Sequence, residues 1–207
     1  SVIHFTSEAQ FSMTNLRAAF SIHLVQGKPV TICYSISMTI GEEESAAMDY
    51  RAAKESIQKD LDTNRLLFAM VDTSNEHFSH WIRRSQADLL SLLATTTKGL
   101  RYPYAGVPWY NTSFGRDGLI TAMETLWLAP EISRHVLLFL ADKQAIELIP
   151  AKDAEPGKIL HEARSGEMAN TGEVPFKEYY GTTDATPLFV MLGGMYYERT
   201  ADHALLR

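Results

Sequence analysis

The chain has 207 residues, of which 45% are hydrophobic and 21% are charged, a composition typical of a globular protein with a substantial core. Its net charge of −6 and the lack of a run of basic residues argue against a protein that follows nucleic-acid phosphates. Cys33 is the only cysteine, which excludes intramolecular disulfides and a cysteine-based zinc site and favours a reducing compartment.

Two further features concern the compartment and the extent of the chain. No apolar run approaches the ~18 residues that a membrane-spanning helix needs, and the start, SVIHFTSEAQ, lacks the basic and apolar regions of a signal peptide. We therefore expect a cytoplasmic protein that does not bind membranes. The first residue is not Met, and the final RTADHALLR resembles the start of another helix, so we expect a piece of a longer protein.

The first pattern along the chain is that of a β-hairpin. Residues 30–40, VTICYSISMTI, alternate between apolar and polar side chains, as a half-buried strand does. Phe20, Ile22 and Leu24 alternate in the same way, and the QGKP between the two runs has turn-forming residues. We predict that the two runs pair as an antiparallel hairpin, which needs more sheet or a helical partner to be stable.

Helical patterns follow the predicted hairpin. Residues 44–61, ESAAMDYRAAKESIQKDL, indicate an Ala-rich helix with a mostly polar surface. Residues 72–99 place apolar side chains at helical spacing, with Ser74 or Asn75 as the N-cap and Gly99 as the end of the helix.

The rest of the chain alternates helices with two unusual loops. Residues 102–115, YPYAGVPWYNTSFG, hold two prolines, two glycines and five aromatic residues, too many breakers for a helix and too many rings for an ordinary solvent loop. The second loop, residues 149–183, exceeds the ~12–15 residues beyond which loops are usually functional or disordered, and we interpret it as functional. Helices are predicted over residues 116–128, 130–148 and 184–202. With no strands expected between them, the predicted fold class is mainly α, an array of helical hairpins with its chemistry in the loops.

The adjacent Arg116 and Asp117 have two interpretations. A guanidinium donates hydrogen bonds in a fork and a carboxylate accepts them, so the pair could hold the hydroxyls of a sugar whose face stacks on Trp109 or Tyr110. Alternatively, Asp117 stabilises a helix N-terminus and the aromatic residues belong to the core.

A group of four ionisable residues lies in the second loop. His161, Glu162, Glu167 and Glu173 could serve acid–base chemistry or be solvated loop charges, and their spacing does not match the HExxH zinc motif.

The start of the last predicted helix also has two interpretations. Thr183 or Asp184 is placed to cap it, with Pro187 in its first turn, and Tyr179 and Tyr180 before it offer stacking surfaces.

The segments that carry these residues resemble the amylo-α-1,6-glucosidase (glycogen-debranching-type) family of bacterial glycoside hydrolases. The resemblance covers residues 75–207, and its densest parts are YPYAGVPWYNTSFGRDGLITAMETLWLAPE, DAEPGKILHEARSGEMANTGEVPFKEYYGTTDATPLFVML and YYERTAD. It implies a glucoamylase-like (α/α)6 barrel whose loops at one end form the sugar pocket. It also implies three parts: residues 1–44 as the tail of a β-rich N-terminal domain, 45–74 as a helical linker, and 75–207 as the first portion of the catalytic barrel.

The resemblance also implies roles for individual residues. Arg116 and Asp117 would grip the outer hydroxyls of a terminal glucose, with Trp109 and Asn111 nearby. Glu162 and Asp184 fall in matching loops and are further substrate-binding candidates. The substrate would be an α-glucan oligosaccharide, hydrolysed at a terminal α-glucosidic bond with inversion, without a metal or organic cofactor.

No catalytic residue is assigned within the chain. The resemblance implies that the general acid and base lie beyond Arg207, on later barrel segments, the acid in a Gly-Trp-Lys-Asp-Ser-like stretch that is missing here. We therefore expect this chain alone to be inactive and to self-associate through uncovered half-barrel faces. The alternative is a glucan-binding or assembly module without catalytic activity.

Overall fold

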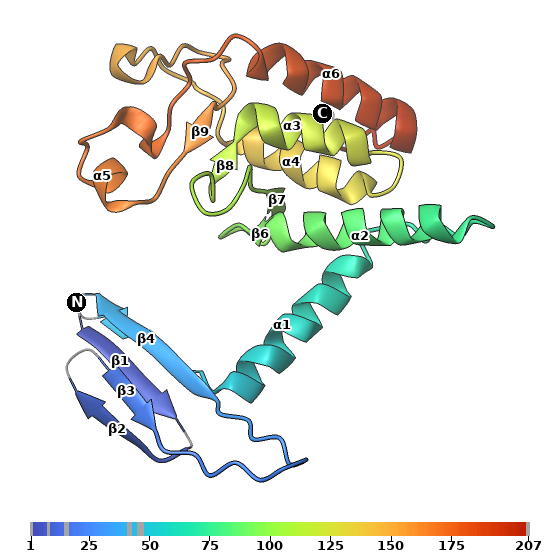
Figure 1. Cartoon of the computed structure of the whole chain (residues 1–207). Helices are drawn as coiled ribbons and strands as arrows, with labels where there is room; N and C mark the ends of the chain where they lie inside the picture. The colour runs from blue at the N-terminus through green and yellow to red at the C-terminus, as the bar shows by residue number, and fades with distance from the viewer. Residues whose placement is uncertain (1, 8, 15–16, 41–42, 45–47, 206–207) are drawn as a thin grey trace. The chain divides into compact units, whose positions relative to one another are not determined.

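The computed structural model describes residues 2–7, 9–14, 17–40, 43–44 and 48–205, and the chain divides into two compact units, residues 1–62 and 63–207 (Figure 1). The boundary falls inside the segment 45–74 that we treated as a linker. Among the described residues, no helix combines the length and the apolar character that crossing a membrane requires.

The described part of the N-terminal unit consists of two small antiparallel sheets and a helix. Strand β4 (Tyr34–Ile40) lies between β1 (Val2–Ser7) and β5 (Glu43–Glu44), while β2 (Phe11–Thr14) pairs with β3 (Arg17–Phe20). The helix α1 (Tyr50–Arg65) begins six residues later than expected, after Asp49, whose Oδ1 accepts hydrogen bonds from the backbone N–H groups of Arg51 and Ala52. Residues 45–47 of the predicted helix lie outside the described residues.

The predicted hairpin between residues 20–24 and 30–40 is wrong. β4 pairs instead with β1, in a register that sets Phe5 opposite Ile36. The reason is aromatic packing: the Phe5 ring stacks on Tyr34 with the ring centroids 5.4 Å apart and meets the edge of Phe11 at 5.1 Å. Alternation shows that residues 34–40 can form a strand, but not which strand lies beside it.

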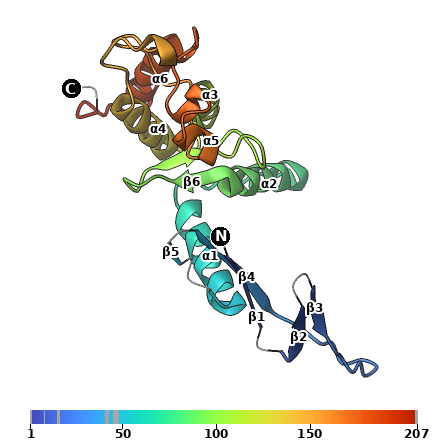
Figure 2. The same cartoon turned by 90° about the vertical axis from the view of Figure 1, so that its left-hand side faces the viewer.

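The C-terminal unit is built around three helices, α3 (Gly115–Thr125), α4 (Pro130–Asp142) and α6 (Ala185–Thr200), which lie side by side in Figures 1 and 2. The buried core they form contains the fully buried side chains of Leu119, Ile132, Leu140 and Leu192. The Ser133 hydroxyl donates to the carbonyl of Ala122 over 2.8 Å and ties α4 to α3.

The remaining elements of this unit are short, apart from one helix. They are α2 (Glu76–Leu92), β6 (Leu93–Thr95), β7 (Arg101–Pro103), β8 (Ser113–Phe114), the 3-10 helix η1 (Pro150–Lys152), β9 (Glu162–Ala163), α5 (Glu167–Asn170) and the 3-10 helix η2 (Pro175–Lys177). Strands β6 and β7 form one antiparallel pair, and β8 and β9 form another. The expectation of no strands between the helices is therefore wrong.

The predicted ends of the helices are partly confirmed. Asn75 is the N-cap of α2, and its side chain accepts a hydrogen bond from the N–H of Phe78 at 3.1 Å, as predicted. The predicted end at Gly99 is wrong: α2 ends at Leu92, and Gly99, with a φ of +77°, lies in the turn that joins β6 to β7. Helix α4 ends at Asp142 rather than 148, because the N–H of Ala145 bonds instead to the carbonyl of Lys158.

The described structure thus combines helices with small antiparallel strand pairs. The (α/α)6 barrel and the three-part division stay predictions.

Candidate functional site

The two loops singled out from the sequence meet at the start of α3. Strand β8, at the end of the aromatic loop, pairs with β9 in the second loop, with Phe114 opposite Glu162. The N–H of Gly115 donates to the carbonyl of His161 over 2.8 Å. A side chain at Gly115 would overlap the carbonyl oxygen of Leu160, so glycine is required by this close approach of two backbones.

Arg116 and Asp184 form an ion pair across this junction. Nη1 of Arg116 donates to Oδ2 of Asp184 at 3.1 Å, and the hydroxyl of Thr182 bonds the other carboxylate oxygen. The Thr182 hydrogen bond, together with the guanidinium of Arg116, lowers the pKa of Asp184 below its ordinary value. Asp184 occupies the N-cap position of α6, as predicted, but its side chain makes no capping hydrogen bond.

Asp117 is half-buried in the first turn of α3. Its carboxylate makes no hydrogen bond or ion pair with any residue that the structure describes, but its charge acts on the buried side chain of Tyr102. Burial, and secondly the charge of Asp117, raise the pKa of Tyr102, whose hydroxyl donates to the carbonyl of Phe114 at 2.8 Å. The position agrees with both interpretations of Asp117, a free acceptor for a ligand and a charge at a helix N-terminus.

Trp109 and Asn111 lie in a separate place, a groove of about 630 Å³ between the aromatic loop and residues 164–176. The groove falls within the size range of small-ligand sites, roughly 300–1,000 Å³. Trp109 is 79% exposed, which leaves its ring free to stack on a ligand. The other lining residues are Pro108, Thr112, Arg164, Ser165, Gly166, Glu167, Met168, Ala169, Val174 and Phe176.

Glu162 does not line this groove. Its side chain is buried, with 5% of the residue exposed, and its Oε2 accepts a hydrogen bond from Nε of Arg164 at 2.7 Å. Glu167 is an exposed lining residue, whereas Glu173 accepts a hydrogen bond from the Thr171 hydroxyl at 3.1 Å. Among the described residues, no group of His, Cys, Asp and Glu side chains is arranged to hold a metal ion.

His161 adjoins the same junction. Its ring meets Phe114 and Tyr179 edge to face, with centroids 5.9 and 6.0 Å away. Its Nδ1 is buried and has no hydrogen-bond partner among the described residues.

The catalytic acid and base are expected beyond Arg207, and the structure bears only on the binding candidates. Arg207 itself lies outside the described residues, which end at Leu205. The placement of the acid and base on segments after Arg207 therefore stays a prediction.

No family model matches this chain, and no curated protein matches it either.

In the structure, the six predicted substrate-binding residues fall into three groups. Trp109 and Asn111 line the groove, Arg116, Asp117 and Asp184 lie at the adjoining starts of α3 and α6, and Glu162 is buried at the β8–β9 pair between the two loops. Sequence reasoning missed Arg164 and Thr182. The signal for Arg164 was its opposite charge two positions after Glu162, just past the end of β9.

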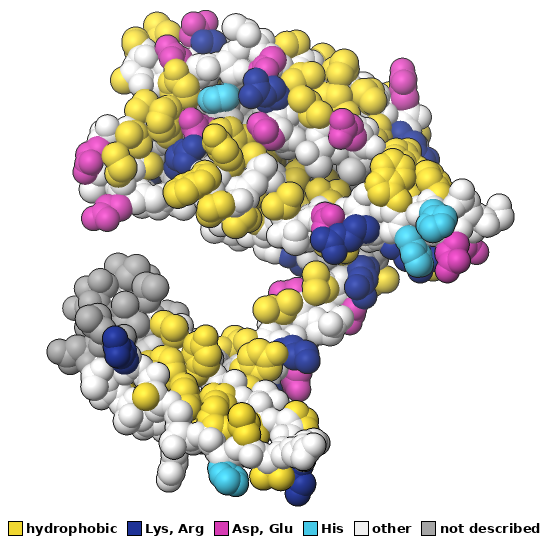
Figure 3. All heavy atoms as spheres, in the orientation of Figure 1, with side chains coloured by type: hydrophobic (Ala, Val, Ile, Leu, Met, Phe, Trp, Pro, Cys, Tyr) yellow, Lys and Arg dark blue, Asp and Glu magenta, His cyan; other side chains and the backbone are white. Residues whose placement is uncertain are grey.

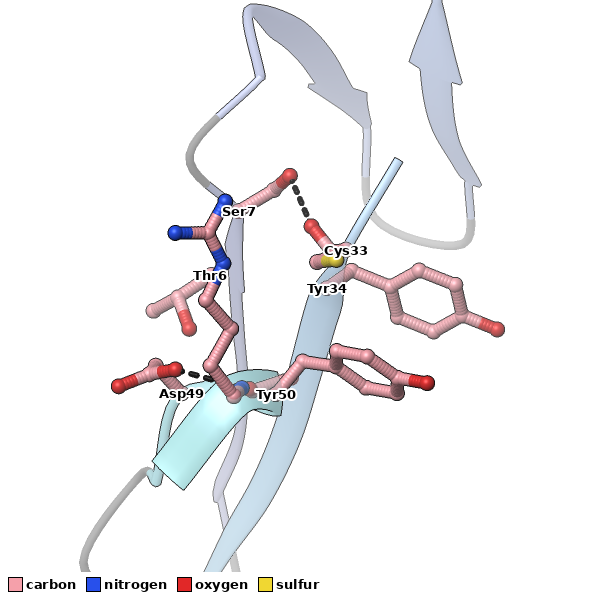
Figure 4. Close-up of a pocket in the computed structure, with 8 residues that line it drawn as sticks. Thr6, Ser7, Cys33, Tyr34, Asp49 and Tyr50 are labelled. Carbon is pink, nitrogen blue, oxygen red and sulfur yellow. Dashed lines mark hydrogen bonds between the residues drawn. The ribbon is translucent and has the colours of Figure 1, made fainter. Parts of the chain in front are cut away.

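A second hollow, of about 350 Å³, lies in the N-terminal unit and contains none of the predicted residues (Figure 4). The Ser7 hydroxyl donates to the carbonyl of Cys33 at 2.6 Å, and Asp49 is engaged at the start of α1. The rings of Tyr34 and Tyr50 lie on the same side in Figure 4. Because two of its polar side chains, those of Ser7 and Asp49, are bonded within the unit, the hollow is a weaker candidate than the Trp109 groove.

Proposed function

We propose that this chain is the sugar-binding portion of a glycoside hydrolase of the amylo-α-1,6-glucosidase type, which acts on terminal α-glucosidic bonds of glycogen- or starch-type oligosaccharides. The observation that carries the proposal is the meeting of the two loops. It gathers an exposed indole, a groove of ligand size and two arginine–carboxylate pairs in neighbouring parts of one unit.

The chemistry of these groups suits a neutral sugar. A sugar ring has weakly apolar faces that stack on aromatic rings and a rim of hydroxyls that donate and accept hydrogen bonds. Arg116 is paired with Asp184 and Arg164 with Glu162, so each cation has a nearby anion and the charges balance. On the face drawn in Figure 3, side chains of both signs are interspersed with hydrophobic ones.

Neither arginine-paired carboxylate at the junction is suited to act as a general acid. A general acid needs a raised pKa, whereas the pKa of Asp184 is lowered by Thr182 and Arg116. Glu162 is buried against Arg164 and does not line the groove. This supports an acid and a base elsewhere in the parent barrel, where an inverting mechanism requires two carboxyl groups ~6.5–9.5 Å apart.

A second candidate function is a glucan-binding or assembly module without catalysis. Two observations favour it: both arginine-paired carboxylates are engaged, and α6 has exposed apolar residues, among them Val190 and Met191. Both candidate functions use the groove to bind a glucan, but only the first belongs to a protein that hydrolyses it. We expect this chain alone not to hydrolyse maltose, isomaltose or panose, and turnover that is lost in Glu162→Gln or Glu167→Gln would contradict that expectation.

Binding is tested with the full chain, maltotriose and isomaltotriose, by calorimetry and intrinsic fluorescence. Trp109→Ala is expected to weaken binding by about twofold to tenfold, because an aromatic contact is worth roughly 0.5–1.5 kcal/mol beyond its buried area. Trp81→Ala is the matched control, since Trp81 is an exposed indole on α2 and does not line the groove. Equal effects of the two substitutions, or no saccharide binding by the unmodified chain, would refute the proposal.

A further inference from the structure

Arg164 is held from three sides by groups of its own unit. Its Nε donates to the buried Oε2 of Glu162 at 2.7 Å, and its Cζ lies 5.6 Å from the ring centroid of Phe114 and 5.9 Å from that of Phe176. Its backbone N–H donates to the carbonyl of Phe176 at 2.8 Å. The guanidinium plane is thereby fixed before any ligand arrives, and fewer rotamers are lost on binding.

Most of the donors of this guanidinium are unused. Arginine has five N–H donors, and only the one on Nε is engaged by a described residue. The side chain is 35% exposed, and the residue lines the groove that also contains Trp109 and Asn111. The two terminal nitrogens are thus the donors left for a ligand in the groove.

The charges around Arg164 indicate the class of that ligand. Glu162 balances the cation at 2.7 Å, and Glu167 adds a negative charge to the lining. An anionic ligand would meet this excess of carboxylates, whereas two neighbouring hydroxyls can accept the parallel hydrogen bonds that a guanidinium fork offers.

We propose that Arg164 is a sugar-binding residue of the Trp109 groove, donating through its terminal nitrogens to two vicinal hydroxyls of a neutral hexose unit stacked on Trp109. Glu162 is the positioning residue that orients the guanidinium. The assignment rests on the proposed carbohydrate function and adds to it a specific donor, a specific place and a preference for uncharged sugars.

The test measures the affinity of the full chain for maltotriose by calorimetry. Arg164→Lys keeps the positive charge but loses the fork, and we expect the affinity to fall by about tenfold or more. Arg134→Lys is the matched control, because Arg134 also faces a carboxylate through Nε, 3.7 Å from Asp202, but does not line the groove. Glu162→Gln is expected to lose less affinity than Arg164→Lys, since the amide oxygen still accepts from Nε.

The possible results separate the role of Arg164 from the proposed carbohydrate function on which it rests. If the unmodified chain and Arg164→Lys bind maltotriose equally well, the role of Arg164 is overturned and the carbohydrate function still stands. No binding of maltotriose or isomaltotriose by the unmodified chain overturns both. Tighter binding of glucuronate than of glucose overturns the preference for neutral sugars.

A second measurement uses only the unmodified chain, so it remains informative if a substituted chain fails to fold. The side-chain N–H signals of Arg164 in the unmodified chain, assigned through their own side-chain carbons, are followed by NMR as maltotriose is added. We expect them to shift while those of Arg134 stay in place. Arg164 signals that are unmoved at saturation overturn the proposal.

Discussion

Nη1 of Arg116, in the first turn of α3, lies 3.1 Å from Oδ2 of Asp184, the residue before α6, although the two are 68 positions apart in the chain. Both side chains are partly exposed, so the pair contributes little to stability, typically ~0–1 kcal/mol for exposed ion pairs. The pair links the starts of α3 and α6.

The pH dependence of this pair can be predicted from its sign. The pKa of Asp184 is lowered from an ordinary 3.8, so its contribution to stability is fully present above that pH and is lost as the pH falls through the lower, folded-state pKa. We expect Asp184→Asn to melt at a lower temperature than the unmodified chain at pH 6, and the gap to close below pH 3.8. A gap in Tm that widens on acidification would contradict the lowered pKa.

Asp117→Asn separates the two interpretations of Asp117. If the carboxylate grips a sugar hydroxyl, the loss of a charged acceptor worth ~1.5–3 kcal/mol lowers the affinity for maltotriose about ten- to hundredfold, or kcat/KM of a full-length enzyme by the same factor. Tm then changes little, because a charge at a helix N-terminus is typically worth ~0.3–1 kcal/mol. A destabilised variant with normal affinity would end the sugar-binding role of Asp117. Calorimetry and thermal melting of the one variant provide both quantities.

His135 makes the C-terminal unit sensitive to mild acid. Its Nδ1 accepts a hydrogen bond from the N–H of Arg101 at 3.2 Å, and burial, followed by the charges of Arg134 and Arg101, lowers its pKa from 6.5, with Glu131 opposing. Stability is therefore complete above pH 6.5 and declines as the pH falls from there to the folded-state pKa, by at most about 1.36 kcal/mol per pH unit.

His135→Gln checks this prediction, because the amide cannot take up the proton. Urea unfolding at pH 8 and pH 5.5 should show a loss of stability in the unmodified chain that is smaller in the variant. Equal losses would mean that other groups carry the acid sensitivity.

Two glycines provide opposite tests of packing. Gly115→Ala places a methyl group against the carbonyl of Leu160 and should destabilise the chain by about 1–3 kcal/mol or more, because backbone must move. Gly194→Ala lies within α6, where an added methyl meets nothing within 4 Å, and should stabilise by about 0.4–1 kcal/mol. Denaturant titrations of both variants measure the two effects, and a neutral Gly115→Ala would show that the two backbones are not in close contact.

Local signals allowed parts of the fold to be predicted. The Asn75 cap and the presence of α3, α4 and α6 follow from side-chain chemistry and periodicity within a few residues. Strand partners do not, because the choice of β1 over residues 20–24 depends on rings that pack across distant segments, Phe5 on Tyr34. Gly99 shows the same limit, since a glycine that can end a helix can equally form a hairpin turn.

The sequence indicated the residue types of the candidate site but not their arrangement. Arginine and aspartate beside aromatic rings indicated sugar chemistry, yet nothing local showed that Arg116 would pair with Asp184 instead of with its neighbour Asp117. Likewise, Glu162 is buried where β9 pairs with β8, a long-range contact that no local pattern indicated.

That strand pairing also has a kinetic consequence. The Thr112 hydroxyl bonds the carbonyl of Ala163, so the two sides of the groove are joined by residues 51 positions apart, with α3 and α4 between them. Contacts between distant segments form after local ones, because closing the intervening loop costs entropy. During synthesis the groove can take shape only once residues 164–176 have emerged, when α3 and α4 are already made. If the chain binds saccharides as we propose, their affinity reports the formation of this long-range contact, and it should return later than helical circular dichroism when the chain is diluted out of denaturant.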